Sequence, residues 1–270
     1  MKLLKKGIST IAIVSASLSP MLVSAQTEKE PLVVREVTVA EGVGNGNASE
    51  FKQVLGMLKG ELKTRLLKKF NVLSRDLKAI NEEAAVSGDV ELKKAKYILL
   101  TTVTGFTDGS ANNPSEAGVA HTRTIKLFGT VDILKLNGET FTSTPFSVSL
   151  HKGKMEIAGV ARDEKFGDEL VEQASKEAAS QIATSVLFSI APPKVTDVTG
   201  KQVTIDWGDG FITKGDKLEV FALKIKESAD PVEIKVGDLE INRVTPKSST
   251  GLIIGENLGI VEGCVLRRPQ

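Results

Sequence analysis

Two histidines are the residues of this chain that are best suited to bind a metal ion or to move a proton. His121 and His151 are the only histidines, and both fall in or beside segments that we expect to pair as strands, across which they would approach each other. A metal site or a hydrolase also needs a cysteine, carboxylate or nucleophile nearby, and neither histidine has one at ligand spacing. We therefore expect two partly exposed polar side chains. A hydrolase or metal enzyme stays as a third hypothesis, which predicts loss of activity or metal in His121→Ala or His151→Ala.

Two further patterns resemble ligand loops without meeting their rules. Residues 42–46 are rich in glycine and precede a predicted helix, but they lack the Gly-Lys-Ser/Thr of a phosphate loop and the spacing of a dinucleotide fingerprint. Asp206, Asp209 and Asp216 lie among glycines, but they do not follow the calcium-loop pattern. We expect an ordinary loop and turn aspartates, and hence no cofactor, no metal and no enzymatic activity.

Composition narrows the class of partner. The net charge of +1 argues against bulk nucleic acid, and only 4% of the residues are aromatic, too few for a stacking surface. The one cysteine, Cys264, cannot form an internal disulfide, and we expect it to be buried. Trp207, in a predicted loop, is a candidate partner contact, although a place in the core fits it equally well. Lys59 and Lys63, on the basic face of a predicted helix, are candidates too, although a solvated face fits them as well.

Residues 1–25 have the pattern of a secretory signal peptide. A basic start (Lys2, Lys5, Lys6) precedes an apolar stretch at 8–18 and small residues at 23–25. The stretch is too short to span a bilayer, and no later segment is apolar for long enough to do so. No cysteine follows the cleavage site, so we expect an exported mature chain that begins near Gln26 and is not a lipoprotein.

The segment 26–191 predicts an α+β domain with an antiparallel or mixed sheet and its helices packed on one face. Apolar spacings of three and four predict helices at 51–70 and 162–190, and a shorter helix is expected at 75–83. Strands are expected at 32–40, 71–74, 95–106, 119–136 and 139–150. The polar residues 107–117 predict a loop, and Asn137-Gly138 predicts a type I′ hairpin turn.

The segment 192–270 changes character and predicts a small all-β barrel domain. Pro192 and Pro193 end the preceding helix, which places the domain boundary there. Short β segments separated by glycine-rich turns follow at 194–199, 202–206, 217–223, 232–244 and 249–256.

Two resemblances follow from these segments. Residues 32–190 resemble the curli secretion-channel family in element order and at Phe70, Val72, Arg75, Glu82, Ala95, Tyr97, Ile98, Val103 and Phe106. Residues 203–221 resemble the small β domain of the flagellar T-ring periplasmic protein at Ile205, Gly208, Gly215, Asp216, Leu218 and Val220. The T-ring protein also contains a domain related to the curli-channel fold, so the pairing strengthens both matches.

These resemblances imply a bacterial periplasmic protein, either free or associated with the outer membrane, that forms rings as its relatives do. The chain departs from the curli channel because it lacks the lipid-anchor cysteine, and because its hairpin at 119–150 carries Lys126 and Asp132 where a lipid-facing strand pair needs an apolar side. We therefore expect a non-catalytic scaffold or assembly protein of an envelope complex that acts by protein–protein contacts. The alternative is a binding module that regulates a peptidoglycan synthase or another cell-wall enzyme.

Overall fold

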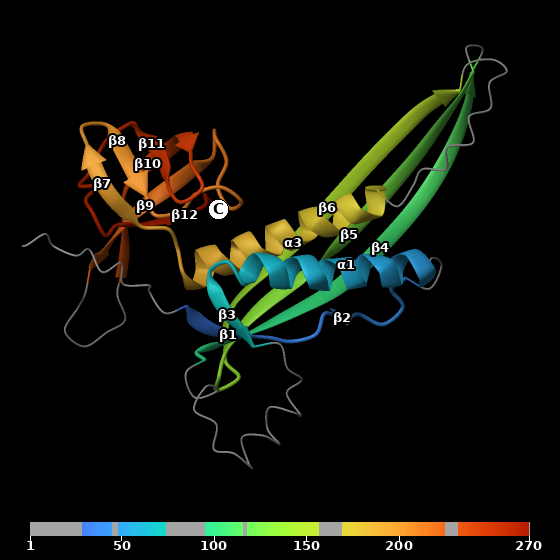
Figure 1. Cartoon of the computed structure of the whole chain (residues 1–270), viewed down its shortest axis with the longest axis horizontal. Helices are drawn as coiled ribbons and strands as arrows, with labels where there is room; N and C mark the ends of the chain where they lie inside the picture. Colours follow the sequence, from blue (N-terminus) through green and yellow to red (C-terminus); the bar gives the residue numbers. More distant parts are fainter. Residues whose placement is uncertain are drawn as a thin grey trace, which may run out of the picture.

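The computed structural model describes residues 29–44, 48–73, 95–115, 118–156, 169–224 and 232–269. The predicted signal peptide and the predicted helix at 75–83 lie outside these ranges. Within them the chain forms two helices and two sheets (Figure 1). The predicted α+β class is confirmed.

The first sheet is mixed, as predicted. Its strands are β1 (Glu30–Val34), β2 (Thr38–Val39), β3 (Phe70–Leu73), β4 (Tyr97–Ser115), β5 (Gly118–Lys135) and β6 (Thr140–Glu156). The order is β3-β1-β4-β5-β6, with β2 beside β4. β1 runs parallel to β3 and β4, whereas β4, β5 and β6 form an antiparallel ladder. Among the described strands, β6 therefore lies at an edge of this sheet.

Helices α1 (Ala48–Leu66) and α3 (Glu169–Ile190) lie side by side on one face of this sheet (Figure 1). The buried residues of α1 recur at the predicted spacing, at Phe51, Val54, Leu58, Leu62 and Leu66. The α3 stripe contains buried alanines, whose small side chains let two helices approach closely. Both long helices are confirmed, but α1 ends at Leu66, four residues before its predicted end, and Phe70 belongs to β3. α3 begins at Glu169, and residues 162–168 of its predicted range lie outside the description.

The loop predicted at 107–117 is wrong over its described residues. β4 continues to Ser115 and pairs with β5 down to Gly118. The polar composition misled because this end of the sheet extends past the N-terminal ends of α1 and α3 (Figure 1), where polar side chains are hydrated on a regular strand. We call residues 107–115, 118–126 and 148–156, the outer parts of β4, β5 and β6, the arm. β6 also runs six residues beyond the predicted end at Leu150.

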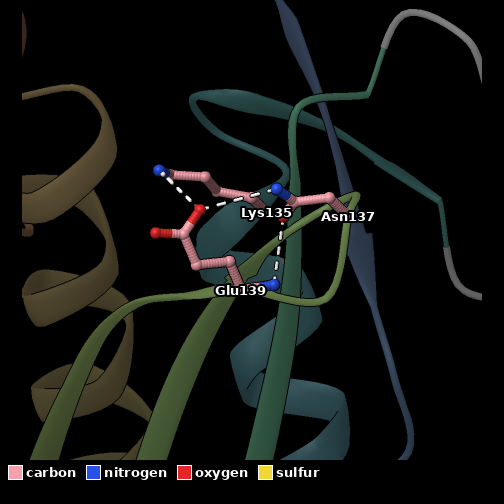
Figure 2. A network of polar contacts seen from close by, with 3 residues as sticks. All are labelled: Lys135, Asn137 and Glu139. Atoms are coloured by element: carbon pink, nitrogen blue, oxygen red, sulfur yellow. Dashed lines mark hydrogen bonds and ion pairs between the residues drawn. The ribbon is translucent and has the colours of Figure 1, made fainter.

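The hairpin between β5 and β6 is confirmed, but its turn type is not. Gly138 has φ +85°, whereas the non-glycine residues described all have negative φ, so Asn137 cannot occupy a type I′ position. The N–H of Lys135 donates to the Glu139 carbonyl at 2.8 Å, which leaves a three-residue loop with glycine at its left-handed position. In Figure 2 the Asn137 Oδ1 accepts from the Glu139 N–H at 3.0 Å. Hydrogen bonds from Lys135 and Asn137 lower the pKa of the exposed Glu139 carboxyl below its usual value.

The second sheet contains β7 (Val195–Thr199), β8 (Gln202–Ile205), β9 (Lys217–Lys224), β10 (Val232–Val244), β11 (Ser249–Ile254) and β12 (Val265–Arg267). Its order is β12-β9-β10-β11-β8-β7. The chain entering β7 lies against β12, because the Val195 N–H donates to the Cys264 carbonyl at 2.9 Å. In the described ranges, the two ends of the sheet meet through the isolated bridge Lys194–Val265 and a few neighbouring backbone hydrogen bonds, but β7 and β12 do not pair as strands, so a closed barrel is not shown.

Candidate functional site

The structure does not bring the two histidines together. The register places His121 opposite Asn112, and its Nδ1 lies 2.8 Å from the Asn112 Oδ1. It places His151 opposite Thr124, with His151 Nδ1 3.0 Å from Thr124 Oγ1. Thr124 is three positions from His121 on β5, and an odd separation puts side chains on opposite faces. The predicted approach across the ladder is therefore wrong. Among the described residues, no group of three or more histidine, cysteine or carboxylate side chains is placed to hold a metal ion.

The aspartates of the second sheet serve its turns. Asp216 accepts hydrogen bonds from the Thr213 N–H and Oγ1, both at 2.9 Å. Asp206 Oδ1 accepts from the Lys194 N–H at 2.7 Å. These two carboxylates orient loops, which confirms the prediction of turn aspartates for them. Cys264 is buried, as predicted.

Trp207 lies inside the molecule, at the contact between α3 and the second sheet. Its side chain is 2% exposed. Its ring meets Phe188 of α3 edge-on at 5.1 Å between centroids and meets Phe211 at 5.6 Å, and the Lys69 ammonium lies 5.4 Å above it. The surface role predicted for Trp207 is thus corrected, because the aromatic cluster covers the ring. Trp207 joins the two sheets, whose buried apolar side chains form one continuous core.

A guanidinium group strengthens the same junction. Arg267 of β12 donates to the carbonyl oxygen of Phe188, near the end of α3, and also pairs with Glu233. The last turn of α3 has no basic residue of its own. Since carbonyl groups at a helix C-terminus lack helical donors, Arg267 satisfies one of them from outside the helix. The second sheet is therefore tied to α3 by polar as well as apolar contacts.

The basic face of α1 lies on the surface. Lys59 forms an ion pair with Glu36, and the side chains of both are more than half exposed. Lys63 is exposed, and a Cβ at Gly56 or Gly60 would meet nothing within 4 Å. The two lysines are accessible to a partner, and their contact role stays a prediction.

An ion pair links β4 and β5 within the arm, on the face of the sheet that the helices cover further along. The Arg123 Nε donates to the Asp108 Oδ1 at 2.8 Å, and a second guanidinium contact reaches the other carboxylate oxygen. Only 11% and 9% of these side chains are exposed. Nearby, Ile125 is buried under the helices. The arm thus has a fixed register and a partly buried base.

The free edge of β6 is the extended surface that the sequence did not reveal. Beyond β5, β6 pairs with no other named strand in the described parts of the chain. Two features blunt its inner half: Pro145 lacks an N–H, and the Ser147 N–H is capped by Gln181 Oε1 of α3 at 3.2 Å. The predicted strand ends at Leu150, whereas β6 continues to Glu156, so the sequence pattern does not indicate the outer part of this edge.

Comparison with known proteins adds distant likenesses only. Neither a protein-family model nor a curated protein sequence matches the chain. A solved structure of a neuraminyllactose-binding hemagglutinin homologue from Helicobacter pylori is 12% identical over 63% of this chain and 88% of its own, with a TM-score of 0.38. A minor lipoprotein from Acinetobacter baumannii is 14% identical over 58% and 90%, at 0.32. The PelC dodecamer from Paraburkholderia phytofirmans is 11% identical over 57% and 84%, at 0.29. With TM-scores this low, these likenesses support no argument about fold or function.

Among the described helices, neither α1 nor α3 combines the length and apolar character that a bilayer crossing needs.

Proposed function

We propose that this chain is a non-catalytic scaffold or assembly protein, exported to the periplasm and acting by protein–protein contacts within a bacterial envelope complex. The resemblances to the curli secretion-channel family and to the T-ring β domain motivate this placement in the periplasm. The second resemblance also motivates the proposal that the second sheet closes into a small barrel. The mature chain begins near Gln26, is not a lipoprotein, and assembles into a homo-oligomer.

The observation that carries this proposal is the long edge of the first sheet. β6 spans 17 residues, whereas strands in globular proteins usually have about five or six. Its outer part lies in the arm, beyond the helices (Figure 1). Unpaired backbone donors and acceptors in a row are a template for another chain. This surface suits association better than catalysis, since the histidines of the arm lie on opposite faces.

A regulator of a peptidoglycan synthase is the second candidate, and the surface of α1 favours it. Lys63 is exposed, and Lys59 is half exposed beside it on the same helix. The glycines at 56 and 60 leave open space next to them, so another protein can approach the helix backbone.

One pair of measurements separates the two candidates. The scaffold predicts a discrete homo-oligomer of the purified mature chain, 26–270, that a Lys59→Glu/Lys63→Glu variant retains. The regulator predicts that a purified synthase binds the wild-type chain directly and binds this double variant at least about tenfold more weakly. Thr64→Glu, which adds a negative charge at an exposed position on the same helix, is the matched control. A chain that neither self-associates nor binds a synthase would contradict both.

A further inference from the structure

The backbone of β6 shows which of its amides point away from the sheet. The Ser147 N–H donates to Gln181 Oε1 rather than to β5. In an antiparallel ladder, successive residues direct their N–H and C=O groups alternately to the two sides of the strand. The pairing of β5 with β6 has no irregularity from Thr142 to Glu156. The N–H groups of Ser149, His151 and Gly153 therefore point outward, on the same side as that of Ser147.

These three amides mark the open part of the edge. Pro145 and the Gln181 cap protect the positions before them, by means that natural sheets use to block strand addition. From Ser149 to Gly153, the described residues provide no proline or side-chain cap on that side. The open window lies in the arm, where Lys152 reaches Glu169, the first residue of α3. Its length suits one added strand of ordinary size.

The charge at the window selects the kind of strand. β6 has no carboxylate side chain from Thr140 to Met155, and its outer third contains His151, Lys152 and Lys154. This part of the strand is therefore basic. The Lys152 ammonium lies 2.9 Å from a carboxylate oxygen of Glu169, but the two side chains are 41% and 82% exposed, so water screens this pair. The lysine remains accessible to a second carboxylate.

The two faces of the window differ in the space that they offer. Buried Phe146 and Val148 show that even-numbered side chains point toward the helices, which puts Lys152 on that face. Odd-numbered side chains lie on the opposite face, where a Cβ at Gly153 would have Thr122 Cγ2, at 3.8 Å, as its only neighbour within 4 Å. Carboxylates therefore fit on the first face and a large side chain fits on the second.

We propose that residues 149–153 accept an extended, acidic segment of a partner protein as an added strand at the edge of β6. Backbone hydrogen bonds to the outward amides would provide affinity, carboxylates at alternate positions would lie beside Lys152, and a larger side chain would lie beside Gly153. This inference rests on the proposed function, since it assumes action by protein contact, and it names the chemistry of one partner.

The test uses the mature chain and a short fluorescent peptide that alternates Glu and Val, with anisotropy as the readout. His151→Pro removes one outward N–H, as Pro145 already does in the same strand, and we expect it to weaken binding about tenfold or more. Ser143→Pro changes the same edge outside the window and should bind like wild type. Lys152→Glu, and a peptide with Lys in place of Glu, should also bind weakly.

If a protein variant fails to fold, the same question is tested by changing the peptide instead of the protein. N-methylation of alternate peptide amides blocks strand pairing while the protein stays unchanged, and it should abolish binding. The proposal is overturned if wild type does not bind the acidic peptide, if binding ignores N-methylation, or if the lysine peptide binds equally well. It is overturned too if His151→Pro instead dissolves a homo-oligomer, which would make a second copy the occupant. A homo-oligomer that ignores the peptide refutes this inference and leaves the proposed scaffold intact.

Discussion

Replacing Trp207 with alanine tests the junction between α3 and the second sheet. The ring is 2% exposed, and it contacts Phe188, Phe211 and the Lys69 ammonium. Removing a buried aromatic side chain costs about 3–5 kcal/mol, because apolar contacts are lost and a cavity remains. Within that loss, each aromatic pair accounts for about 0.5–1.5 kcal/mol and the cation–π contact for about 0.5–1 kcal/mol. Trp207→Phe keeps a ring at the site and leaves a smaller cavity, so it should cost less than Trp207→Ala.

The assay is urea denaturation followed by far-UV circular dichroism, because Trp207 is the only tryptophan and its fluorescence disappears in both variants. The midpoint should fall strongly for Trp207→Ala and slightly for Trp207→Phe, with similar slopes. In the wild type, tryptophan emission should be shifted to the blue relative to the unfolded chain and resist acrylamide quenching. A loss below about 1 kcal/mol in Trp207→Ala, or wild-type emission as exposed as that of the unfolded chain, would refute the buried junction.

Three further predictions concern the first sheet. Gly129→Ala should lower the melting temperature sharply, because the added Cβ would overlap a backbone oxygen of β4. Gly109→Ala is the control and should change the melting temperature little, because a Cβ at this position would meet nothing within 4 Å. Similar effects of the two substitutions would contradict the described ladder. Asp108→Asn should destabilise the chain by about 1.5–3 kcal/mol, because it removes the negative charge from a largely buried ion pair; a neutral effect in urea unfolding would argue against strand structure at this end of β4. The pKa of Glu139 is lower in the folded chain than in the unfolded chain. Its hydrogen bonds therefore stabilise the fold at pH values above the pKa that Glu139 has in the unfolded chain, and this contribution disappears as the pH falls through its pKa in the folded chain. Glu139→Gln should therefore lose a small, salt-sensitive part of the wild type's stability at neutral pH and match it in acid, as pH-dependent unfolding would show; equal stability at every pH would contradict the hydrogen bonds.

The helices and the central strands could be predicted because local pattern and tertiary packing agree. In α1, the buried residues Phe51, Val54, Leu58, Leu62 and Leu66 all belong to the apolar stripe predicted from the sequence. In β5, buried Ile125, Leu127, Val131 and Ile133 alternate with polar residues, as expected of a strand with one covered face.

The misses arose where a neighbouring element decides the structure. The polar end of β4 is a strand only because β5 supplies its ladder, and composition does not reveal that pairing. The Asn137-Gly138 pair fits either of two hairpin loops, and the flanking strand register selects the three-residue one. Trp207 is followed by a glycine-rich stretch that looked exposed, and only the docking of α3 buries it. The open window on β6 depends on which amides point outward, and this follows from the register alone.

The solution mass of the mature chain, 26–270, tests the central claim of self-association most directly. Light scattering across a range of protein concentrations should give one discrete oligomeric mass that persists on dilution. A strict monomer at the highest concentration would contradict the proposed scaffold and would leave an adaptor that acts only when it is bound to another protein.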